Sequence, residues 1–282
     1  MRAAALPSWA SLYSLLHLNG FPGDTTFYSG ACTGASRILE LGAGDGRVAE
    51  ALCQTADIDY VGVELCEDFV AAASERLSSC ARARVVLGDM LEVGLAGGEP
   101  FDAVLMTANT FFCTPNHEEL LMRCREALRP GGRLLFDVYN AQDWHEEALH
   151  GPPEGLDGGE DAIDGDGHPP PSDGRRSGSE EEQESDVLVM AVDADGREWT
   201  VYERDPDVDA NARTIRCTYD FEAASGERAS QVNEHFYALP TDVEAMLSAA
   251  GFDVEAVHGG FGREPFDADE SEHVVYTARR RD

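Results

Sequence analysis

Three glycines at alternate positions, Gly42, Gly44 and Gly46, directly follow a short apolar segment of this chain. Glycine lets a backbone turn tightly and approach a ligand closely, so a glycine-rich turn between a strand and a helix suits nucleotide binding. An acidic residue, Glu64, stands twenty positions after Gly44, at the end of the next apolar segment. That spacing predicts a carboxylate that binds the ribose hydroxyls of a nucleotide in an α/β site.

The glycine pattern also distinguishes between two kinds of nucleotide. In the dinucleotide fingerprint G-x-G-x-x-G, the third glycine allows a helix and a strand to pack closely. Counted from Gly42 and Gly44, that third position is Arg47, whose side chain is too large for such packing. The sequence therefore disfavours a nicotinamide dinucleotide, although a dehydrogenase built on the same kind of sheet stays open as an alternative.

Strand-like and helix-like segments alternate along residues 35–141. The predicted strands are residues 37–41, 60–64, 84–87, 103–107 and 133–139. Helices are predicted between them, for example over residues 67–77 and 116–128. Such alternation indicates an α/β fold, in which a parallel sheet carries helices on both faces.

Five pieces of this region resemble, in order, the motifs of class I S-adenosylmethionine (SAM)-dependent methyltransferases. They are Glu40-x-Gly42-x-Gly44-x-Gly46, Y-V-G-V-E at 60–64, V-V-L-G-D-M at 85–90, F-D-A-V-L-M-T-A-N at 101–109 and L-R-P-G-G-R-L-L-F-D at 128–137. The resemblance is strong over residues 35–140 and moderate over residues 240–282. It implies an enzyme with a doubly wound, mostly parallel, seven-stranded Rossmann-like sheet and an inserted antiparallel β lid. The implied cofactor is SAM, and its product is S-adenosylhomocysteine.

The resemblance also assigns cofactor-binding residues by position. Glu64 would accept both ribose hydroxyls, and Asp89 would accept a hydrogen bond from the adenine amine. The glycine turn would approach the amino-acid part of SAM. A solvated acid for Glu64 and a helix cap for Asp89 are the alternatives. The full expected set is Glu40, Gly42, Gly44, Gly46, Glu64, Leu65, Asp89, Met90 and Asn109.

The predicted organisation is one core with an insertion. Residues 151–186 are rich in glycine, proline, serine and acidic residues, so they bury too little surface to become ordered. Beyond them, apolar and polar residues alternate with a period of two, which predicts two β-hairpins. The predicted units are N-terminal cap helices over 1–34, a SAM-binding core over 35–141, an acidic disordered loop over 142–186, an antiparallel lid over 187–239 and a C-terminal completion of the core over 240–282.

The composition bounds the partners of the protein. The net charge is −33, and all 21 basic residues are arginine. Nucleic acids and anionic membranes attract cationic side chains, so neither is an expected partner. Seven cysteines without a C-x-x-C pair disfavour a disulfide framework and a zinc site, and they indicate a reducing compartment. We expect a cytoplasmic protein, with organelle targeting by residues 1–20 as an alternative and the oligomeric state open.

Residues 106–109, which span the end of the fourth predicted strand, help to restrict the class of substrate. They lack the Asn/Asp-Pro-Pro-Tyr/Phe motif of family members that methylate nucleobases or amides, and the acidic ligands of magnesium-dependent members. The resemblance therefore implies metal-independent, in-line transfer to a small polar metabolite. We expect an amine nitrogen as acceptor, because the predicted lid is similar to that of N-methyltransferases. A thioether or hydroxy-acid acceptor and a non-catalytic SAM-binding protein are the alternatives.

Candidate catalytic residues are His235, as a general base on the lid, and Tyr139, which ends the fifth predicted strand beside the expected methyl position. Arg216 would bind a substrate carboxylate through its guanidinium fork, with a surface ion pair as the alternative. Aromatic side chains would face a cationic acceptor, or they would belong to the core. The expected substrate-binding set is Tyr13, Phe111, Trp199, Arg216, Tyr219 and Tyr237.

Overall fold

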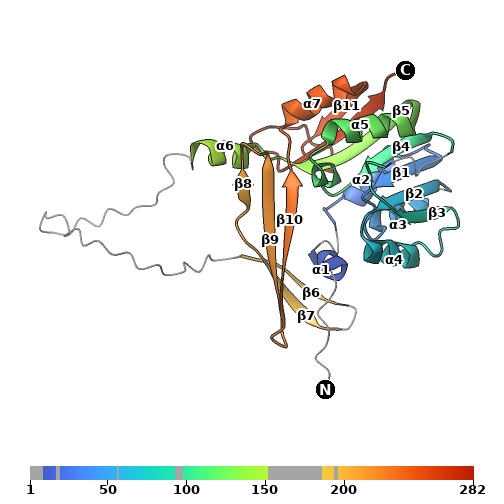
Figure 1. Ribbon diagram of the computed structural model, residues 1–282. Coiled ribbons are helices and arrows are strands. Elements are labelled where there is room, and N and C mark those ends of the chain that lie inside the picture. Colours follow the sequence, from blue (N-terminus) through green and yellow to red (C-terminus); the bar gives the residue numbers. More distant parts are fainter. Residues whose placement is uncertain (1–8, 17–19, 56, 93–97, 152–185, 194–195) are drawn as a thin grey trace, which may run out of the picture.

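The computed structural model describes residues 9–16, 20–55, 57–92, 98–151, 186–193 and 196–282. A seven-stranded sheet with helices packed against it forms the larger part of the molecule, and a five-stranded antiparallel sheet forms the smaller part (Figure 1). In this part of the chain, no helix combines the length and the apolar composition needed to cross a membrane.

The large sheet has the strand order β11-β12-β5-β4-β1-β2-β3. Its strands are β1 (Arg37–Leu41), β2 (Asp59–Glu64), β3 (Ala83–Leu87), β4 (Phe101–Met106), β5 (Leu128–Tyr139), β11 (Phe252–His258) and β12 (His273–Arg280). Only β12 runs antiparallel to its neighbours, β5 and β11. The prediction of a mostly parallel, seven-stranded sheet is therefore confirmed.

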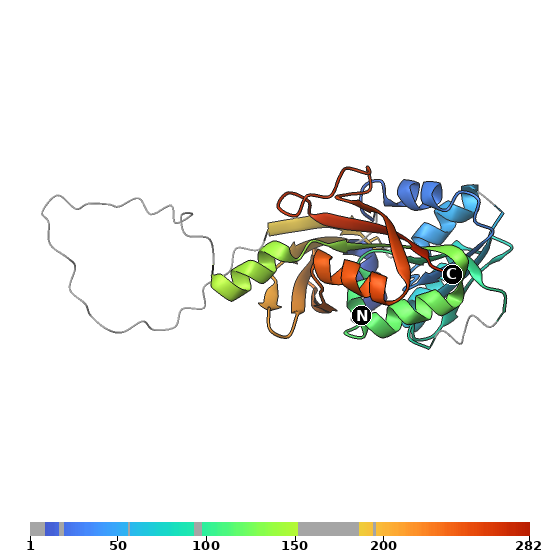
Figure 2. The same cartoon turned by 90° about the horizontal axis from the view of Figure 1, so that it is seen from above.

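Helices cover both faces of this sheet (Figure 2). The helices are α2 (Asp24–Ala31), α3 (Arg47–Thr55), α4 (Glu67–Arg76), α5 (His117–Ala127) and α7 (Pro240–Ala249). Alternate residues of one strand join different core layers, because successive side chains of a strand point to opposite faces. In β4, Met106 packs with α5 and α7, whereas Leu105 packs with α2 and α3. Burial on both faces explains why the parallel strands read as nearly continuous apolar segments.

The small sheet forms the lid that the sequence predicts. Its strands are β6 (Asp186–Val192), β7 (Glu198–Glu203), β8 (Asp207–Asp209), β9 (Thr214–Ala223) and β10 (Arg228–Phe236). The hairpins β6–β7 and β9–β10 are antiparallel, as predicted. Helix α1 (Trp9–Leu16) packs Leu12 and Leu15 into a small core on this sheet, together with Trp199 and Phe221.

Some local elements differ from the predictions. The loop expected over 142–186 does not begin at residue 142, because Gln142–His150 form helix α6. Trp144 of this helix packs on the main core, with its ring 5.3 Å from that of Tyr139, and this contact orders the segment. The remainder of the expected loop, 152–185, lies outside the described residues. Helix α2 and the short strand β8 were not individually predicted from the sequence.

Candidate functional site

A cavity of about 590 Å³ lies at the carboxyl ends of β1, β2, β3 and β4 and is bordered on its other side by α1 and β10. The strand order of the large sheet reverses between β4 and β1. Ligands of open α/β sheets bind at such a reversal, outside the carboxyl ends of the strands. The volume lies within the range of sites that hold a small molecule or cofactor, roughly 300–1,000 Å³.

The glycine turn forms one wall of the cavity. Gly42 and Gly44 both line it and have φ values of +68° and +53°. A Cβ atom at Gly42 would lie 2.6 Å from the Thr110 side chain, so only glycine fits there. Gly46, predicted to bind cofactor, lies outside the lining, and a Cβ atom there would lie 3.2 Å from Ala73 of α4. In this structure the lack of a side chain at Gly46 allows the glycine turn to pack closely on α4, and its contact with a cofactor stays a prediction.

Glu64 lines the cavity at the end of β2, and its carboxylate is held by two backbone groups. The Gly44 N–H donates to Oε2 at 2.9 Å, and the Cys66 N–H donates to Oε1 at 2.8 Å. These bonds join the glycine turn to the end of β2 and fix the carboxylate at the cavity wall. Glu64 is therefore a half-buried, oriented acceptor rather than a freely solvated acid.

Leu65, Asp89 and Met90 surround the next part of the cavity. Asp89 Oδ1 accepts a hydrogen bond of 2.8 Å from the Leu91 N–H, so it caps a turn and lines the cavity at the same time. Leu65 is 72% exposed, which leaves an apolar side chain at the cavity edge. A polar edge group beside apolar side chains suits a flat heterocycle that both stacks and hydrogen-bonds.

Glu40 is a buried carboxylate at the base of the cavity. The Tyr60 hydroxyl donates to it at 2.5 Å and the Thr107 hydroxyl at 2.8 Å, so Glu40 of β1 is bonded to β2 and to the residue after β4. Burial raises the pKa of the Glu40 carboxyl to about 7, although both hydrogen bonds favour the ionised form. Glu40, which was predicted to bind cofactor, is thus part of the cavity lining.

Asn109 was predicted to bind cofactor, but it lies outside the cavity lining. Ala108 and Asn109 have φ values of +53° and +63°, a conformation that non-glycine residues rarely adopt. Two hydrogen bonds stabilise this backbone conformation. Asn109 Oδ1 accepts one from the Tyr139 N–H at 2.8 Å, and the buried Asp137 carboxylate accepts one from the Ala108 N–H at 3.0 Å. Asn109 therefore shapes the turn after β4, of which Ala108 lines the cavity.

His235 of β10 lines the cavity from the lid side, as predicted. The Tyr139 ring lies 5.6 Å from the His235 ring but is not part of the lining. The Tyr139 hydroxyl is buried and has no hydrogen-bond partner within the described ranges. Burial also raises the pKa of Tyr139 well above its ordinary value, which opposes deprotonation. A catalytic role for Tyr139 is therefore not supported by its position.

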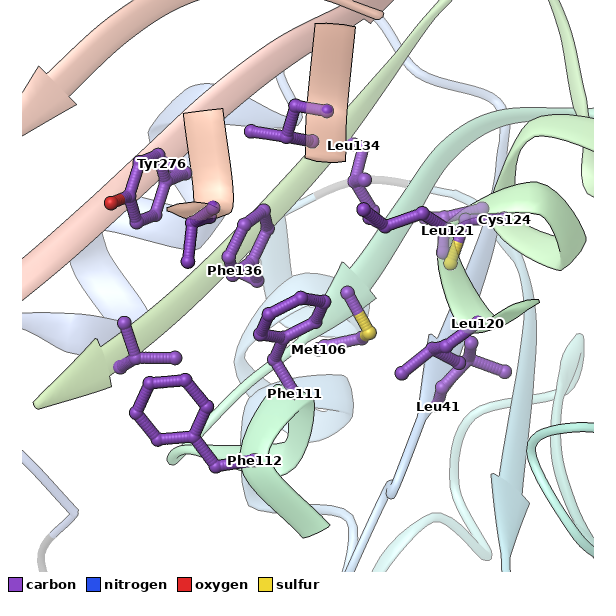
Figure 3. Packing of buried hydrophobic residues seen from close by; sticks show 14 of the residues in the cluster. Leu41, Met106, Phe111, Phe112, Leu120, Leu121, Cys124, Leu134, Phe136 and Tyr276 are labelled. Carbon is purple, nitrogen blue, oxygen red and sulfur yellow. The ribbon is translucent and has the colours of Figure 1, made fainter. Parts of the chain in front are cut away.

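Of the predicted substrate-binding residues, Tyr13 lines the cavity, with its ring edge-on to Phe69 at 5.5 Å. Three others are buried elsewhere. Phe111 lies in the main core, stacked on His117 at 4.6 Å and directed toward Phe136 (Figure 3). Trp199 lies in the lid core, and the Tyr237 hydroxyl is 2.7 Å from His145 Nδ1. None of these three side chains is part of the cavity lining, so their placement does not support a substrate-binding role.

Arg216 and Tyr219, on opposite faces of β9, are also outside the lining. Arg216 is exposed and forms a 2.9 Å ion pair with Glu234, so the alternative of a surface pair describes it. Tyr219 lies on the inner face of the lid and packs on both the main and the lid cores, with its hydroxyl within hydrogen-bonding reach of Glu203. Both residues were predicted to bind substrate, and neither is part of the cavity lining.

Several lining residues were missed by the sequence analysis. They are Ser14, Thr107, Thr110, Cys113, Thr114, Asn233 and Glu234, among others. The period of two on the lid places Asn233 on the His235 face, and this was the available signal. The most consequential omission is Arg47, which lines the cavity and forms an ion pair with Asp24.

Known proteins share parts of this sequence. Residues 38–132 match a family model described as a methyltransferase domain. A protein-L-isoaspartate O-methyltransferase of Opitutus terrae is 33% identical over 105 residues, which cover 36% of this chain and 41% of that enzyme. The chain spans less than half the length of the curated relatives it matches.

Solved structures share the whole architecture. The CcbJ methyltransferase from Streptomyces caelestis has a TM-score of 0.66 and 21% identity, covering 93% of this chain and 92% of that one. SAM-bound CalS10, an amino pentose methyltransferase from Micromonospora echinaspora, has a TM-score of 0.63 and 18% identity, covering 99% of both chains. At this identity the likeness shows a common fold. The predicted resemblance to class I SAM-dependent methyltransferases is confirmed.

Proposed function

We propose that this chain, in which residues 38–132 are a methyltransferase domain of the class I fold, transfers a methyl group from SAM to an amine nitrogen of a small polar metabolite. The observation behind this proposal is the cavity itself, which places Glu64 and Asp89 on one side and His235 of the lid on the other. In this proposal, the side that holds Glu64 and Asp89 is the cofactor half of the cavity and the His235 side is the acceptor half.

The residues of the cofactor half fit SAM. The Glu64 carboxylate is oriented by two backbone N–H groups, as a ligand of vicinal hydroxyls requires. Met90 and Leu65 offer apolar surface beside Asp89, which suits an adenine ring. When bound, SAM would supply a methyl group that its sulfonium charge already activates. The protein then has to align the acceptor and exclude water, and positioning of this kind contributes about 7–11 kcal/mol to rate enhancement.

The polar groups of the acceptor half favour an amine. Thr110, Cys113, Thr114 and Asn233 supply neutral polar groups there, whereas the charge of Glu234 is paired with that of Arg216. In the lining that the structure describes, the basic side chains are Arg47 and His235. Arg47 lies at the glycine-turn end of the cavity, where it is paired with Asp24. A hydroxy acid would bring a carboxylate with no cation to meet it, whereas a neutral or cationic amine complements these groups.

His235 is the proposed general base. An amine that arrives protonated must lose a proton before its lone pair can attack a methyl carbon. Imidazole is suited to this step because it changes its charge near neutral pH. His235 is the histidine of the described lining, so it is the residue placed to receive that proton.

The proposal also covers the cellular compartment, the class of substrate and the absence of a metal requirement. All seven cysteines are free thiols, which supports a reducing compartment, and we propose the cytoplasm. The net charge of −33 favours a small-molecule substrate over a nucleic acid. Metal independence is proposed because the activated donor needs no Lewis acid.

The direct test incubates the purified protein with methyl-labelled SAM and three matched panels of small amines, hydroxy acids and thioethers. Labelled N-methyl products from the amine panel are the expected result. Label found only in O-methyl or S-methyl products would contradict the amine assignment and support the corresponding alternative.

A non-catalytic SAM-binding protein is distinguished by the same assay. It would bind SAM without transfer to any panel, and deletion of residues 151–186 would abolish its function. The proposed enzyme instead keeps most of its turnover after this deletion, because the lining that the structure describes comes from residues 13–114 and 232–235.

A further inference from the structure

Arg47 is the first residue of α3, directly after the glycine turn, and lines the cavity. Its two terminal nitrogens bind Asp24 in a fork, with Nη1 donating to Oδ1 at 2.9 Å and Nη2 donating to Oδ2 at 2.5 Å. The Asp24 side chain is 4% exposed and that of Arg47 is 19% exposed. The pair is therefore mostly enclosed, which makes its geometry far better defined than that of a surface ion pair.

The segment before α2 is built around this guanidinium. Asp24 also accepts hydrogen bonds from the N–H groups of Phe21 at 3.3 Å and Thr25 at 2.5 Å. Gly20 has φ +59°, and a Cβ atom there would lie 2.2 Å from Arg47 Cζ. These contacts leave the guanidinium one position, between the N-terminal segment and the glycine turn.

The fork with Asp24 does not exhaust the donors of Arg47. A guanidinium has five N–H groups, and the two bonds to Asp24 use one on each terminal nitrogen. The other three N–H groups have no hydrogen-bond partner among the residues that the structure describes. No Arg47 nitrogen is both buried and without a hydrogen bond. Arg47 can therefore accept a second anion without releasing Asp24.

The neighbouring carboxylates do not occupy that second place. Asp45 is bound by Arg76, whose Nη2 lies 2.6 Å from Asp45 Oδ2. Glu40 accepts its hydrogen bonds from Tyr60 and Thr107 rather than from Arg47. The start of a helix also favours negative charge, because its first N–H groups have no partner within the helix.

We propose that Arg47 binds the carboxylate of the methionine part of SAM, and that Asp24 is the positioning residue that holds the guanidinium for it. This inference rests on the proposed function and on the resemblance to class I methyltransferases, which implies that the glycine turn approaches the amino-acid end of SAM. Arg47 and the buried Glu40 then present a cation and an acid at one end of the cavity, which complements the zwitterionic amino acid.

The test compares two ligands by isothermal titration calorimetry. S-adenosylhomocysteine carries the amino acid, whereas 5′-methylthioadenosine has the same nucleoside and a thioether but no carboxylate. Arg47→Gln is expected to weaken binding of S-adenosylhomocysteine by about ten- to a hundredfold, the effect of losing a charged hydrogen-bonding partner. Binding of 5′-methylthioadenosine should change less than about twofold by the same argument.

Arg76→Gln is the matched control, because Arg76 is bonded to the same turn but lies outside the cavity lining. It should leave both affinities unchanged. Asp24→Asn keeps the Arg47 charge but weakens its fixation, so it should show the same ligand selectivity with a smaller loss. A purely structural role of the ion pair predicts instead that Arg47→Gln weakens both ligands equally, and this result would overturn the proposal, as would no change for either ligand.

If Arg47→Gln fails to fold, Arg47→Lys replaces it. Lysine keeps the charge but lacks the planar fork, so a selective loss for S-adenosylhomocysteine is again expected, and an unselective result again overturns the inference. A wild-type protein that binds neither ligand would contradict the proposed function itself. A wild type that binds both while Arg47 variants show no selectivity would contradict this inference alone.

Discussion

The Tyr28 hydroxyl donates a 2.5 Å hydrogen bond to the Asp137 carboxylate, and the two residues are 109 positions apart in the sequence. Asp137 is fully buried and also accepts the Ala108 and Asn109 N–H groups at 3.0 and 3.3 Å. One carboxylate thus connects α2, β5 and the turn that follows β4. Burial raises the pKa of Asp137 to about 6, while these hydrogen bonds favour its charged form.

Tyr28→Phe is expected to reduce the free energy of unfolding by about 1–3 kcal/mol, because it leaves a buried carboxylate with one donor fewer. Urea denaturation at neutral pH measures this change. Tyr276→Phe is the matched control, since Tyr276 is buried and its hydroxyl has no hydrogen-bond partner in the described part of the chain. Equal losses in the two variants would show that the Tyr28 hydrogen bond is not a source of stability.

Glu64→Gln should weaken binding of S-adenosylhomocysteine by about ten- to a hundredfold, because the proposed acceptor of the two ribose hydroxyls would lose its charge. The fold should be retained, since the amide oxygen can still accept one of the two backbone N–H bonds. Titration calorimetry gives the affinity, and a thermal melt checks folding. Glu67→Gln, at an exposed position of α4, is the control. If Glu64→Gln bound S-adenosylhomocysteine as tightly as Glu67→Gln does, Glu64 would be excluded as the ribose ligand.

His235→Gln should lower kcat by about 10²–10⁴-fold with an amine acceptor, the usual contribution of a general base. Binding of S-adenosylhomocysteine should be unchanged, because His235 borders the acceptor half of the cavity. The pH dependence of kcat should also lose the limb on which activity rises with pH. His145→Gln, which alters a histidine bonded to Tyr237, is the control. A wild-type kcat in His235→Gln would exclude His235 as the general base.

Glu40→Gln tests the burial of a carboxyl whose pKa is raised from 4.5 to about 7. The folded state holds this proton more tightly than the unfolded state, so protonation stabilises the fold. That contribution is complete below about pH 4.5 and is lost as the pH rises to about 7. Between these values, the unfolding free energy of the wild type should fall relative to that of Glu40→Gln, by at most about 3 kcal/mol.

Denaturation curves at pH 5 and pH 8 measure this difference for Glu40→Gln. Glu75→Gln removes an exposed carboxyl from α4 and should follow the wild type at both pH values. Parallel pH dependence in all three proteins would mean that the Glu40 carboxyl titrates normally in the folded state.

The sheet could be predicted because its sequence signal is local. Each parallel strand is a short apolar segment, and the glycine turn and Glu64 mark where two of these strands end. Since the carboxyl ends of parallel strands meet at one edge, their polar residues gather there without further information. Glu64 was predicted from spacing, and Glu40 and Asp89 from the resemblance to class I methyltransferases, and all three line the cavity.

The rest of the site depends on contacts between distant parts of the chain. Alternation on the lid indicates which residues share a face, but not that Trp199 would meet α1 in a separate core while His235 met the cavity. Phe111 follows β4 as a ligand-contacting residue would, yet its ring turns into the core. The Arg47–Asp24 pair joins residues 23 positions apart and leaves no periodic pattern.

Helix α1 belongs to both halves of the molecule, because Leu12 and Leu15 pack on the lid while the next face presents Tyr13 to the cavity. One short helix therefore contributes both to the core of the lid and to the wall of the cavity. By thermodynamic linkage, the factor by which a bound acceptor changes the affinity for the cofactor equals the factor by which a bound cofactor changes the affinity for the acceptor. A thermodynamic cycle of four dissociation constants would give the coupling free energy between the two ligands.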